Sequence, residues 1–339
     1  MINRRRFVQG SALLSFFAAL PASLVAEILS SAPPRNGFGP DSTAEEVTAG
    51  LDLTGRVYAI TGANSGLGLE TMRVLALRGA TVIGIARNQA KAEAACNSVV
   101  GSTIPENLEL SQLDSVVACA ERIRNMNTPI DGLICNAGIV AVPEREQVNG
   151  IERHFAINHL GHFVLSNQLL DQLLQSEQGR FVFVSSRAHR NAPAQGILFD
   201  DLGWNDTPYD PQVAYGHSKL ANALCSRELA RRLSGGTATS NALHPGVIVT
   251  NAIRNMSPFM QWVAKNLGWL VTKSIPEGAA TQTYLATNPE LGGVRGHYYS
   301  DCQAIEPTEH VTDDAMAARL WEVSTSLCRD YLPVTTIQA

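Results

Sequence analysis

Tyr215 and Lys219 are spaced so that they could move a proton together, in the segment Tyr215-Gly216-His217-Ser218-Lys219. Their i, i+4 spacing places both side chains on one face of the helix predicted over 214–233. An isolated phenol has a pKa of about 10 and is a sluggish base at neutral pH, but a neighbouring ammonium stabilises the phenolate. The pair is therefore a candidate acid–base group, although a tyrosine and a lysine exposed on a helix surface would show the same spacing.

Polar side chains also stand at two other predicted elements. Ser185 and Ser186 end the strand predicted at 180–185, at the carboxyl edge where open α/β sheets bind ligands. A serine hydroxyl there can donate a hydrogen bond to a substrate oxygen and polarise it. Asn158 lies in the helix predicted over 150–174. From the local sequence alone, a helix cap or a helix kink explains this asparagine as well as a functional role does.

A glycine-rich turn, Thr61-Gly62-Ala63-Asn64-Ser65-Gly66-Leu67-Gly68, follows the first predicted strand and opens a helix. Gly62 permits a tight turn, Gly66 lets the backbone approach a phosphate, and Gly68 lets the helix pack closely against the strand. The free N–H groups of the helix N-terminus attract anions. The strand–turn–helix setting favours a dinucleotide phosphate site. Its predicted residues are Gly62, Asn64, Ser65, Gly66, Leu67 and Gly68.

These residues need a framework, and the chain from Leu51 onward supplies an alternation of short apolar runs and amphipathic segments. That alternation is typical of right-handed βαβ units around a parallel sheet. We predict one α/β domain of the doubly wound Rossmann type, with a seven-stranded, mostly parallel sheet flanked by helices. The predicted strands are 57–61, 81–86, 107–110, 132–135, 180–185, 239–244 and 296–299. The predicted helices are 67–78, 89–100, 115–126, 150–174, 214–233, 277–286 and 313–328.

Composition excludes several other classes of protein. A net charge of −5 with scattered signs leaves no basic stripe for nucleic acid. The six cysteines are far apart and form no CxxC pair, so we expect buried thiols rather than zinc ligands or disulfides. His159 and His162, at i, i+3, have no third ligand nearby, which favours packing roles and no metal. A serine hydrolase would need a GxSxG elbow, and none is present.

The N-terminus differs from the rest of the chain. Arg4-Arg5-Arg6-Phe7 precedes an apolar run over 12–26, which is shorter than the roughly 20 residues that a membrane-spanning helix needs. This layout is typical of a signal peptide and resembles a twin-arginine export signal. We expect export to the periplasm, with an uncleaved membrane anchor or a cytoplasmic protein as the alternative. The predicted organisation is a signal-like segment 1–32, a linker 33–50, the Rossmann domain 51–330 and a tail 331–339.

The GxxxGxG spacing at 62–68, YxxxK at 215–219 and the ordered turns between them resemble the short-chain dehydrogenase/reductase family. The resemblance covers nearly all of 53–328. Within the family, the segments 155–163, 214–222 and 296–302 look like the branch of retinol dehydrogenases and WW-domain oxidoreductases, which act on lipophilic alcohols and carbonyls. An export-like terminus stands where that branch has a membrane anchor, which puts a retinoid substrate in doubt.

The resemblance implies a role for each matching position. Ser186, with Ser185 as the alternative, would polarise the substrate oxygen, and Asn158 would hold a water that links Lys219 to solvent. The implied cofactor contacts are Asp114 at the adenine ring, Asn136, Ala137 and Gly138 in a turn beside the cofactor, Tyr215 and Lys219 themselves, and Pro245, Gly246 and Thr250 at the nicotinamide carboxamide.

Arg87, after the second predicted strand, stands where NAD-preferring members of the family have an acidic residue for the ribose hydroxyls. A guanidinium there suits the 2′-phosphate of NADP, because its N–H groups pair with phosphate oxygens. A solvated surface arginine would look the same in the sequence. We expect NADP(H), with NAD less favoured.

The sequence thus predicts an NADP(H)-dependent oxidoreductase that interconverts a carbonyl and an alcohol, with Tyr215 as acid and base. A non-catalytic NADP-binding or sensing module is the alternative. The apolar segment 251–275, expected to form a lid, suggests a lipophilic small-molecule substrate or peripheral membrane contact, although a helix docked on the core would be equally apolar. Apolar helices around Phe163 and Leu224 could form a homodimer face.

Overall fold

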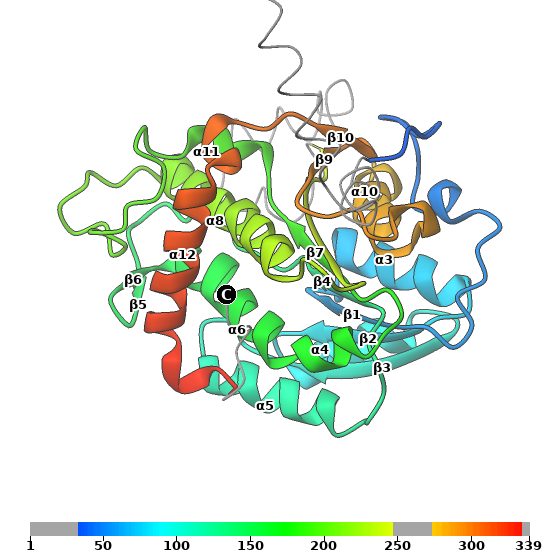
Figure 1. Ribbon diagram of the computed structural model, residues 1–339. Coiled ribbons are helices and arrows are strands. Elements are labelled where there is room, and N and C mark those ends of the chain that lie inside the picture. The colour runs from blue at the N-terminus through cyan, green and yellow to red at the C-terminus, as the bar shows by residue number, and fades with distance from the viewer. Residues whose placement is uncertain (1–32, 247–272, 334–339) are drawn as a thin grey trace, which may run out of the picture.

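The computed structural model describes residues 33–246 and 273–333 of the chain (Figure 1). The signal-like segment 1–32, Thr250 and most of the expected lid lie outside the described residues. Within the described part, no helix combines the length and the apolar character needed to cross a membrane.

An eight-stranded sheet forms the centre of the domain, in the order β10-β9-β8-β7-β4-β1-β2-β3. The neighbouring strands pair in parallel, except that β10 runs antiparallel to β9. The order reverses between β1 and β4, and a sheet of this kind binds ligands at the carboxyl ends flanking that point. The doubly wound prediction is confirmed, with eight strands in place of seven. The strands are β1 Val57–Thr61, β2 Thr81–Ala86, β3 Ser102–Asn107, β4 Gly132–Cys135, β7 Arg180–Val184, β8 Thr239–His244, β9 Tyr298–Ser300 and β10 Gln303–Ile305.

Both edges of the sheet differ from the prediction. The additional strand, β10, follows β9 through a turn in which Asp301 (φ 54°) and Cys302 (φ 61°) adopt the left-handed conformation, so no glycine signals the hairpin. The prediction of β3 at 107–110 was wrong, because the strand precedes that run. Pro105 argues against a strand, but β3 is an edge strand, where a proline is tolerated.

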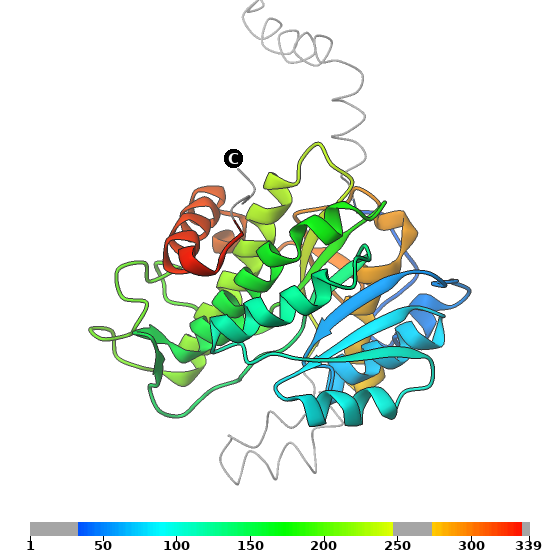
Figure 2. The same cartoon turned by 90° about the horizontal axis from the view of Figure 1, so that it is seen from below.

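Helices cover both faces of the sheet (Figures 1 and 2). One face carries α3 Gly66–Leu77, α4 Gln89–Asn97 and α10 Ile275–Thr287, and the other carries α5 Leu113–Arg124, α6 Gly161–Gln168 and α8 Pro211–Arg232, with α12 Asp314–Leu327 packed on α8. The shorter elements are η1 Glu46–Thr48, η3 Arg187–Asn191, η6 Pro289–Leu291, α11 Glu309–Thr312 and η7 Arg329–Tyr331.

The segment 150–174, predicted as one helix, is divided into several elements. It begins in a small hairpin of β5 Gln147–Val148 and β6 Ile151–Glu152. A π-helical turn, η2 Phe155–Leu160, follows and runs directly into α6, after which α7 Leu170–Leu174 completes the segment. A π-turn in a helix is rare and is often found at functional sites.

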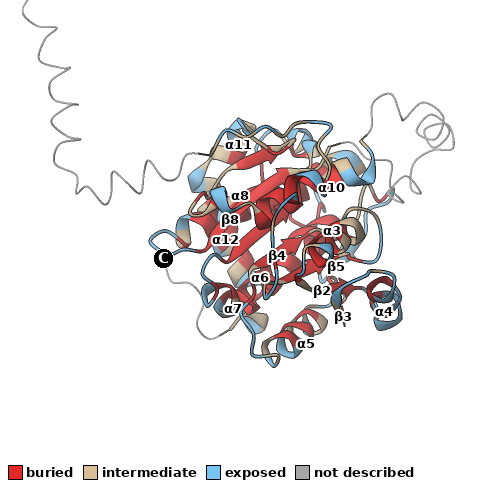
Figure 3. Ribbon diagram, turned by 90° about the vertical axis from the view of Figure 1, so that its right-hand side faces the viewer, coloured by how far each residue is buried: buried red, intermediate tan, exposed pale blue. Residues whose placement is uncertain are grey.

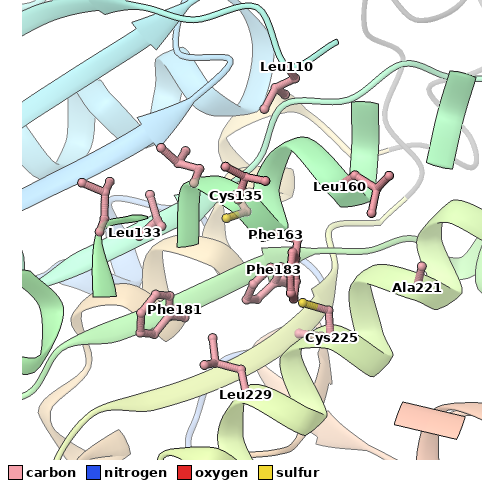
Figure 4. Close-up of a cluster of buried hydrophobic side chains, with 14 of the residues drawn as sticks. Leu110, Leu133, Cys135, Leu160, Phe163, Phe181, Phe183, Ala221, Cys225 and Leu229 are labelled. Carbon is pink, nitrogen blue, oxygen red and sulfur yellow. The ribbon is translucent and has the colours of Figure 1, made fainter. Parts of the chain in front are cut away.

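The buried residues follow the strands and the inner sides of the helices (Figure 3). On the α8 face, Phe181 and Phe183 of β7 pack with Leu133 of β4, Phe163 of α6 and Cys225 of α8, all at most 2% exposed (Figure 4). All six cysteines of the chain are buried and free, so they serve as small apolar core residues.

Residues 33–50, for which we expected a linker, pack against the domain. The Asn36 side chain donates hydrogen bonds to the Tyr284 hydroxyl of α10 at 2.9 Å and to the Cys302 carbonyl at 2.8 Å. The backbone N–H of Ala44, which is fully buried, donates to the Pro276 carbonyl at 2.9 Å. The segment therefore covers α10 and the β9–β10 turn.

Candidate active site

The ends of β1 and β4 are joined by Thr61, the last residue of β1. Its Oγ1 accepts hydrogen bonds from the backbone N–H groups of Asn136 and Ala137, each at 3.0 Å. The Asn136 side chain in turn donates from Nδ2 to the Thr61 carbonyl oxygen at 2.8 Å. These bonds hold the predicted turn at 136–138 beside the glycine-rich loop, at the point where the strand order reverses.

The glycine-rich loop requires glycine for reasons that the geometry makes explicit. Gly62 and Gly66 have φ of 71° and 56°, a region that side chains rarely adopt. A Cβ on Gly68 would lie 2.3 Å from the Gly62 carbonyl oxygen and 2.7 Å from Asn136 Nδ2. No side chain fits there without opening the turn between β1 and α3.

The N-terminus of α3 is free to receive an anion. Its N-cap, Ser65, makes no side-chain hydrogen bond to the first turn, and that turn contains no acidic residue. Asn64 and Ser65 are exposed, and Leu67 is half-buried. Backbone N–H groups with no partner, a positive helix end and a loop without side chains fit the pyrophosphate of a dinucleotide.

The other predicted cofactor residues lie at three further places. Arg87 follows β2 and is exposed, and its guanidinium has no partner among the described residues. Asp114 is the exposed second residue of α5. Pro245 and Gly246 follow β8, with Gly246 at φ 94°. Thr250 cannot be placed, because it lies outside the described residues.

Tyr215 and Lys219 lie in the first turns of α8, and the start of this helix is well defined. Asp210 caps it by accepting hydrogen bonds from two backbone N–H groups, and Pro211 occupies the first helical position. Lys219 Nζ lies 5.8 Å from the centre of the Tyr215 ring. It donates a hydrogen bond to the Val184 carbonyl at the end of β7, 2.8 Å away. Lys219 therefore reaches the carboxyl edge of the sheet, next to the Tyr215 ring.

Burial controls the acidity of both groups. It raises the pKa of the Tyr215 phenol, and a hydrogen bond with the Ser186 side chain opposes that rise. It lowers the pKa of Lys219 to about 8, with a small opposing effect from the Cys135 thiol. We expected the ammonium to dominate and lower the pKa of the phenol, but in the protein alone desolvation is stronger. The phenol is therefore protonated at neutral pH, as a proton donor must be.

The two adjacent serines have different environments. The Ser185 hydroxyl is buried and donates to the Lys219 carbonyl at 2.7 Å, so it supports α8. Ser186 is half-buried and caps η3 by accepting from the Ala188 N–H at 3.1 Å, and its side chain opposes the rise in the pKa of Tyr215. This geometry favours Ser186 over Ser185 as the hydroxyl that meets a substrate.

Asn158 connects the loop after β4 to the catalytic helix. Its Oδ1 accepts from the Ile139 N–H at 2.8 Å, and its Nδ2 donates to Ser218 Oγ at 3.0 Å. Ser218 in turn donates to the Tyr215 carbonyl at 2.7 Å. The residue is fully buried within the π-turn η2.

Gly138 lies between Asn158 and Lys219. A Cβ at this position would lie 3.1 Å from Asn158 Oδ1 and 3.4 Å from Lys219 Nζ. The absent side chain leaves the space between the amide and the ammonium open. The turn at 136–138, Asn158, Ser186, Tyr215 and Lys219 thus come together, whereas Arg87 and Asp114 follow β2 and β3, on the other side of β1.

A buried acid–imidazole pair beside Tyr215 was not predicted. His154 Nδ1 is 2.7 Å from Glu152 Oε1, and both side chains are fully buried. His154 Nε2 accepts from the Val142 N–H at 3.0 Å, so Nδ1 carries the hydrogen that is donated to Glu152. The imidazole packs edge-on against the Tyr215 ring, with 6.0 Å between centroids. In the sequence, a Glu and a His two residues apart carry no distinctive signal.

His159 and His162 have separate partners. His159 Nε2 hydrogen-bonds with Ser324 Oγ of α12 at 2.8 Å, and His162 Nε2 hydrogen-bonds with Thr61 Oγ1 at 2.8 Å. Among the described residues, no cluster of three or more His, Cys, Asp or Glu side chains could hold a metal ion.

Comparison with known proteins matches the sequence of this chain to one family. The family model for short chain dehydrogenases matches residues 56–199. Short-chain dehydrogenase TIC 32 B, a chloroplastic protein of Brassica napus, is 40% identical over 312 residues, which cover 88% of this chain and 96% of the relative. Human retinol dehydrogenase 14 is 39% identical over 80% of this chain and 86% of its own. Human WW domain-containing oxidoreductase is 38% identical over 88% of this chain and 74% of its own.

Solved structures give the same picture. An uncharacterised protein from Mycobacterium paratuberculosis superposes with a TM-score of 0.68 at 34% identity, covering 85% of this chain and 98% of that one. The Pseudomonas aeruginosa RhlG/NADP active-site complex superposes with a TM-score of 0.56 at 23% identity over 72% of this chain and 95% of that one, a likeness of fold.

Proposed function

Because this chain belongs to the short-chain dehydrogenase family, and is therefore an oxidoreductase of carbonyl and alcohol groups, we propose that it uses NADP(H) and that Tyr215 is its acid–base group. The observation that supports the proposal best is the position of Lys219, whose Nζ lies 5.8 Å from the Tyr215 ring and donates a hydrogen bond to the Val184 carbonyl, two residues before Ser186. The glycine-rich loop follows β1 in the same sheet. These groups come from different strand ends and from α8, so only the folded sheet brings them together.

In the direction of reduction, Ser186 Oγ donates a hydrogen bond to the substrate carbonyl oxygen and polarises it. A nicotinamide cofactor, when bound, would supply the hydride for the new C–H bond. As the C=O electron pair moves onto oxygen, the Tyr215 phenol gives that oxygen its proton, and the product is an alcohol. The phenolate left behind is stabilised by the Lys219 ammonium and regains a proton from solvent past Lys219 and Asn158. Oxidation follows the same path in reverse.

The function is tested by following NADPH oxidation with aldehydes and ketones of graded chain length. We expect turnover that improves with the apolar length of the substrate, and a rate of reduction that falls as the pH rises through about 8. The sign follows from Lys219, whose pKa burial lowers to about 8: above that pH the lysine has lost the proton that stabilises the phenolate. Binding of NADPH without turnover of any carbonyl would instead support a non-catalytic binding module.

Arg87→Glu is expected to reverse the cofactor preference. Losing a charge-assisted contact to the 2′-phosphate, and adding a negative charge, should weaken NADPH binding by about 10- to 100-fold while NADH binding stays constant or improves. Fluorescence titration with both cofactors measures the ratio. Arg329→Glu makes the same charge change on an exposed arginine in η7 and should leave the ratio unchanged. An unchanged ratio in the Arg87 variant would remove this residue from the cofactor site.

A further inference from the structure

His162, on α6, is fully buried, and the mechanism above does not use it. Its Nε2 lies 2.8 Å from Thr61 Oγ1 at the end of β1, and its Nδ1 lies 2.9 Å from the main-chain oxygen of Asn158 in the π-turn. The ring therefore connects the end of β1, which precedes the glycine-rich loop, to the π-turn that contains Asn158.

The donors and acceptors along this connection follow from what Thr61 already does. Its Oγ1 accepts from the N–H groups of Asn136 and Ala137, which occupies both lone pairs of the hydroxyl. Its one hydrogen must then be donated. His162 Nε2 at 2.8 Å is a much closer acceptor than the Ile134 carbonyl at 3.5 Å. Nε2 is therefore unprotonated.

The other ring nitrogen must then carry the hydrogen. A neutral imidazole has one N–H, and with Nε2 as acceptor it is Nδ1–H that donates to the Asn158 carbonyl. Burial lowers the pKa of His162 to about 4, so the ring is neutral at any pH where the enzyme would be assayed. The direction of these two hydrogen bonds is thus fixed: Thr61 donates to His162, and His162 donates to the Asn158 carbonyl.

The Asn158 carbonyl is the atom whose position matters. Its side-chain amide is already used by Ile139 and Ser218. The main-chain oxygen accepts from His162 Nδ1, so the position of this carbonyl depends on the histidine. In a π-turn the backbone bonds shift from i+4 to i+5, as Gly161 N to Ala156 O does here. The hydrogen bond from the side chain of His162, four residues after Asn158, holds the Asn158 carbonyl in place within this irregular stretch.

We propose that His162 is a positioning residue for the proton path: with its hydrogen on Nδ1, it fixes the Asn158 carbonyl relative to the turn that would hold the cofactor. This inference rests on the proposed function. It adds a residue that acts through Asn158 and touches neither substrate nor cofactor.

Two substitutions test the two hydrogen bonds of the His162 ring separately. In His162→Asn, the side-chain N–H₂ reaches the place of Nδ1 and keeps the donation to Asn158, whereas in His162→Gln the amide reaches the place of Nε2 and keeps only the Thr61 contact. His159→Gln is the matched control, because that histidine is equally buried on the preceding turn but bonds to Ser324 of α12.

We expect His162→Asn to retain kcat within about threefold, and His162→Gln to lose about tenfold in kcat, the rate equivalent of one hydrogen bond. The solvent isotope effect on kcat should rise in His162→Gln alone, since only there does proton transfer become slower, and the KM for NADPH should stay the same. In the wild-type protein, ¹⁵N NMR of histidine-labelled samples should show His162 as the neutral Nδ1–H tautomer.

Either of two results overturns the inference: a His162 signal with the hydrogen on Nε2, or kcat and isotope effects that are equal in His162→Gln and His159→Gln. Because the NMR measurement uses the wild-type protein, it tests the tautomer of His162 even where a variant misfolds. A wild-type protein that binds NADPH but reduces no carbonyl would instead overturn the proposed function, and with it the role of His162 in a proton path.

Discussion

Tyr215→Phe should lower kcat for carbonyl reduction by about 10²- to 10⁴-fold, the usual contribution of a general acid. The variant removes the hydroxyl that we propose as the proton donor and keeps the ring, which packs against His154. NADPH binding should therefore change little. Single-turnover measurement of NADPH oxidation, with a parallel fluorescence titration of NADPH, separates the two effects.

Tyr284→Phe is the control for this substitution. It deletes a hydroxyl of the same kind, which accepts a hydrogen bond from Asn36 and belongs to a ring that packs near Tyr299 of β9. Some thermal stability should be lost and kcat kept. Turnover in Tyr215→Phe equal to that of Tyr284→Phe would remove the phenol from the reaction and leave another group to supply the proton.

Gly68→Ala should abolish nucleotide binding, with a loss of about 100-fold or more in NADPH affinity. The new methyl group would lie 2.3 Å from the Gly62 carbonyl oxygen and 2.7 Å from Asn136 Nδ2. Backbone cannot move away as a flexible side chain can, and overpacking of this kind costs about 1–3 kcal/mol even where neighbours relax. The turn must open, and the free N–H groups of α3 then no longer converge on a phosphate.

Gly37→Ala adds the same methyl group where nothing lies within 4 Å, and it should bind NADPH as the wild type does. Equilibrium titration of NADPH and the melting temperature of all three proteins are the measurements. Wild-type affinity in a folded Gly68→Ala protein would show that the dinucleotide does not bind at this loop.

The sequence predicted the inner strands better than the sheet edges. β1, β2, β4 and β8 were predicted with their observed bounds. For β1, β2 and β4 the signal is a short apolar run, which is typical of a buried parallel strand, whereas β8 is mostly polar. At the edges that signal fails. β3 contains Pro105 and few buried residues, and β10 is three residues long, so tertiary pairing determines both strands more than their own composition does.

The helix around Asn158 shows a different limit. The run over 150–174 is apolar enough for one long helix, but the hairpin β5–β6 and the π-turn interrupt it. The hydrogen bonds of Asn158 to Ile139 and Ser218 come from residues 19 and 60 positions away. Periodicity within one helix cannot show contacts of that kind.

The motifs located the candidate reacting groups but not the residues that hold them in place. Tyr215, Lys219 and the glycine loop stand out in the sequence because their residue types occur at the spacing that the proposed chemistry needs. Thr61, Glu152 and His162 do not, because a buried threonine, glutamate or histidine is recognised only from its partners in three dimensions. Supporting residues of this kind become visible when each donor is matched with an acceptor.

The hydrogen bonds of Asn36, finally, determine when the segment before β1 can complete its packing during synthesis. Asn36 bonds to the Cys302 carbonyl and accepts a hydrogen bond from the Gln303 side chain, more than 260 residues further along the chain. A nascent protein can make these contacts only after β10 has been synthesised. The segment before β1 is thus held by the last strands of the sheet, and it completes its packing only when both parts of the chain are present.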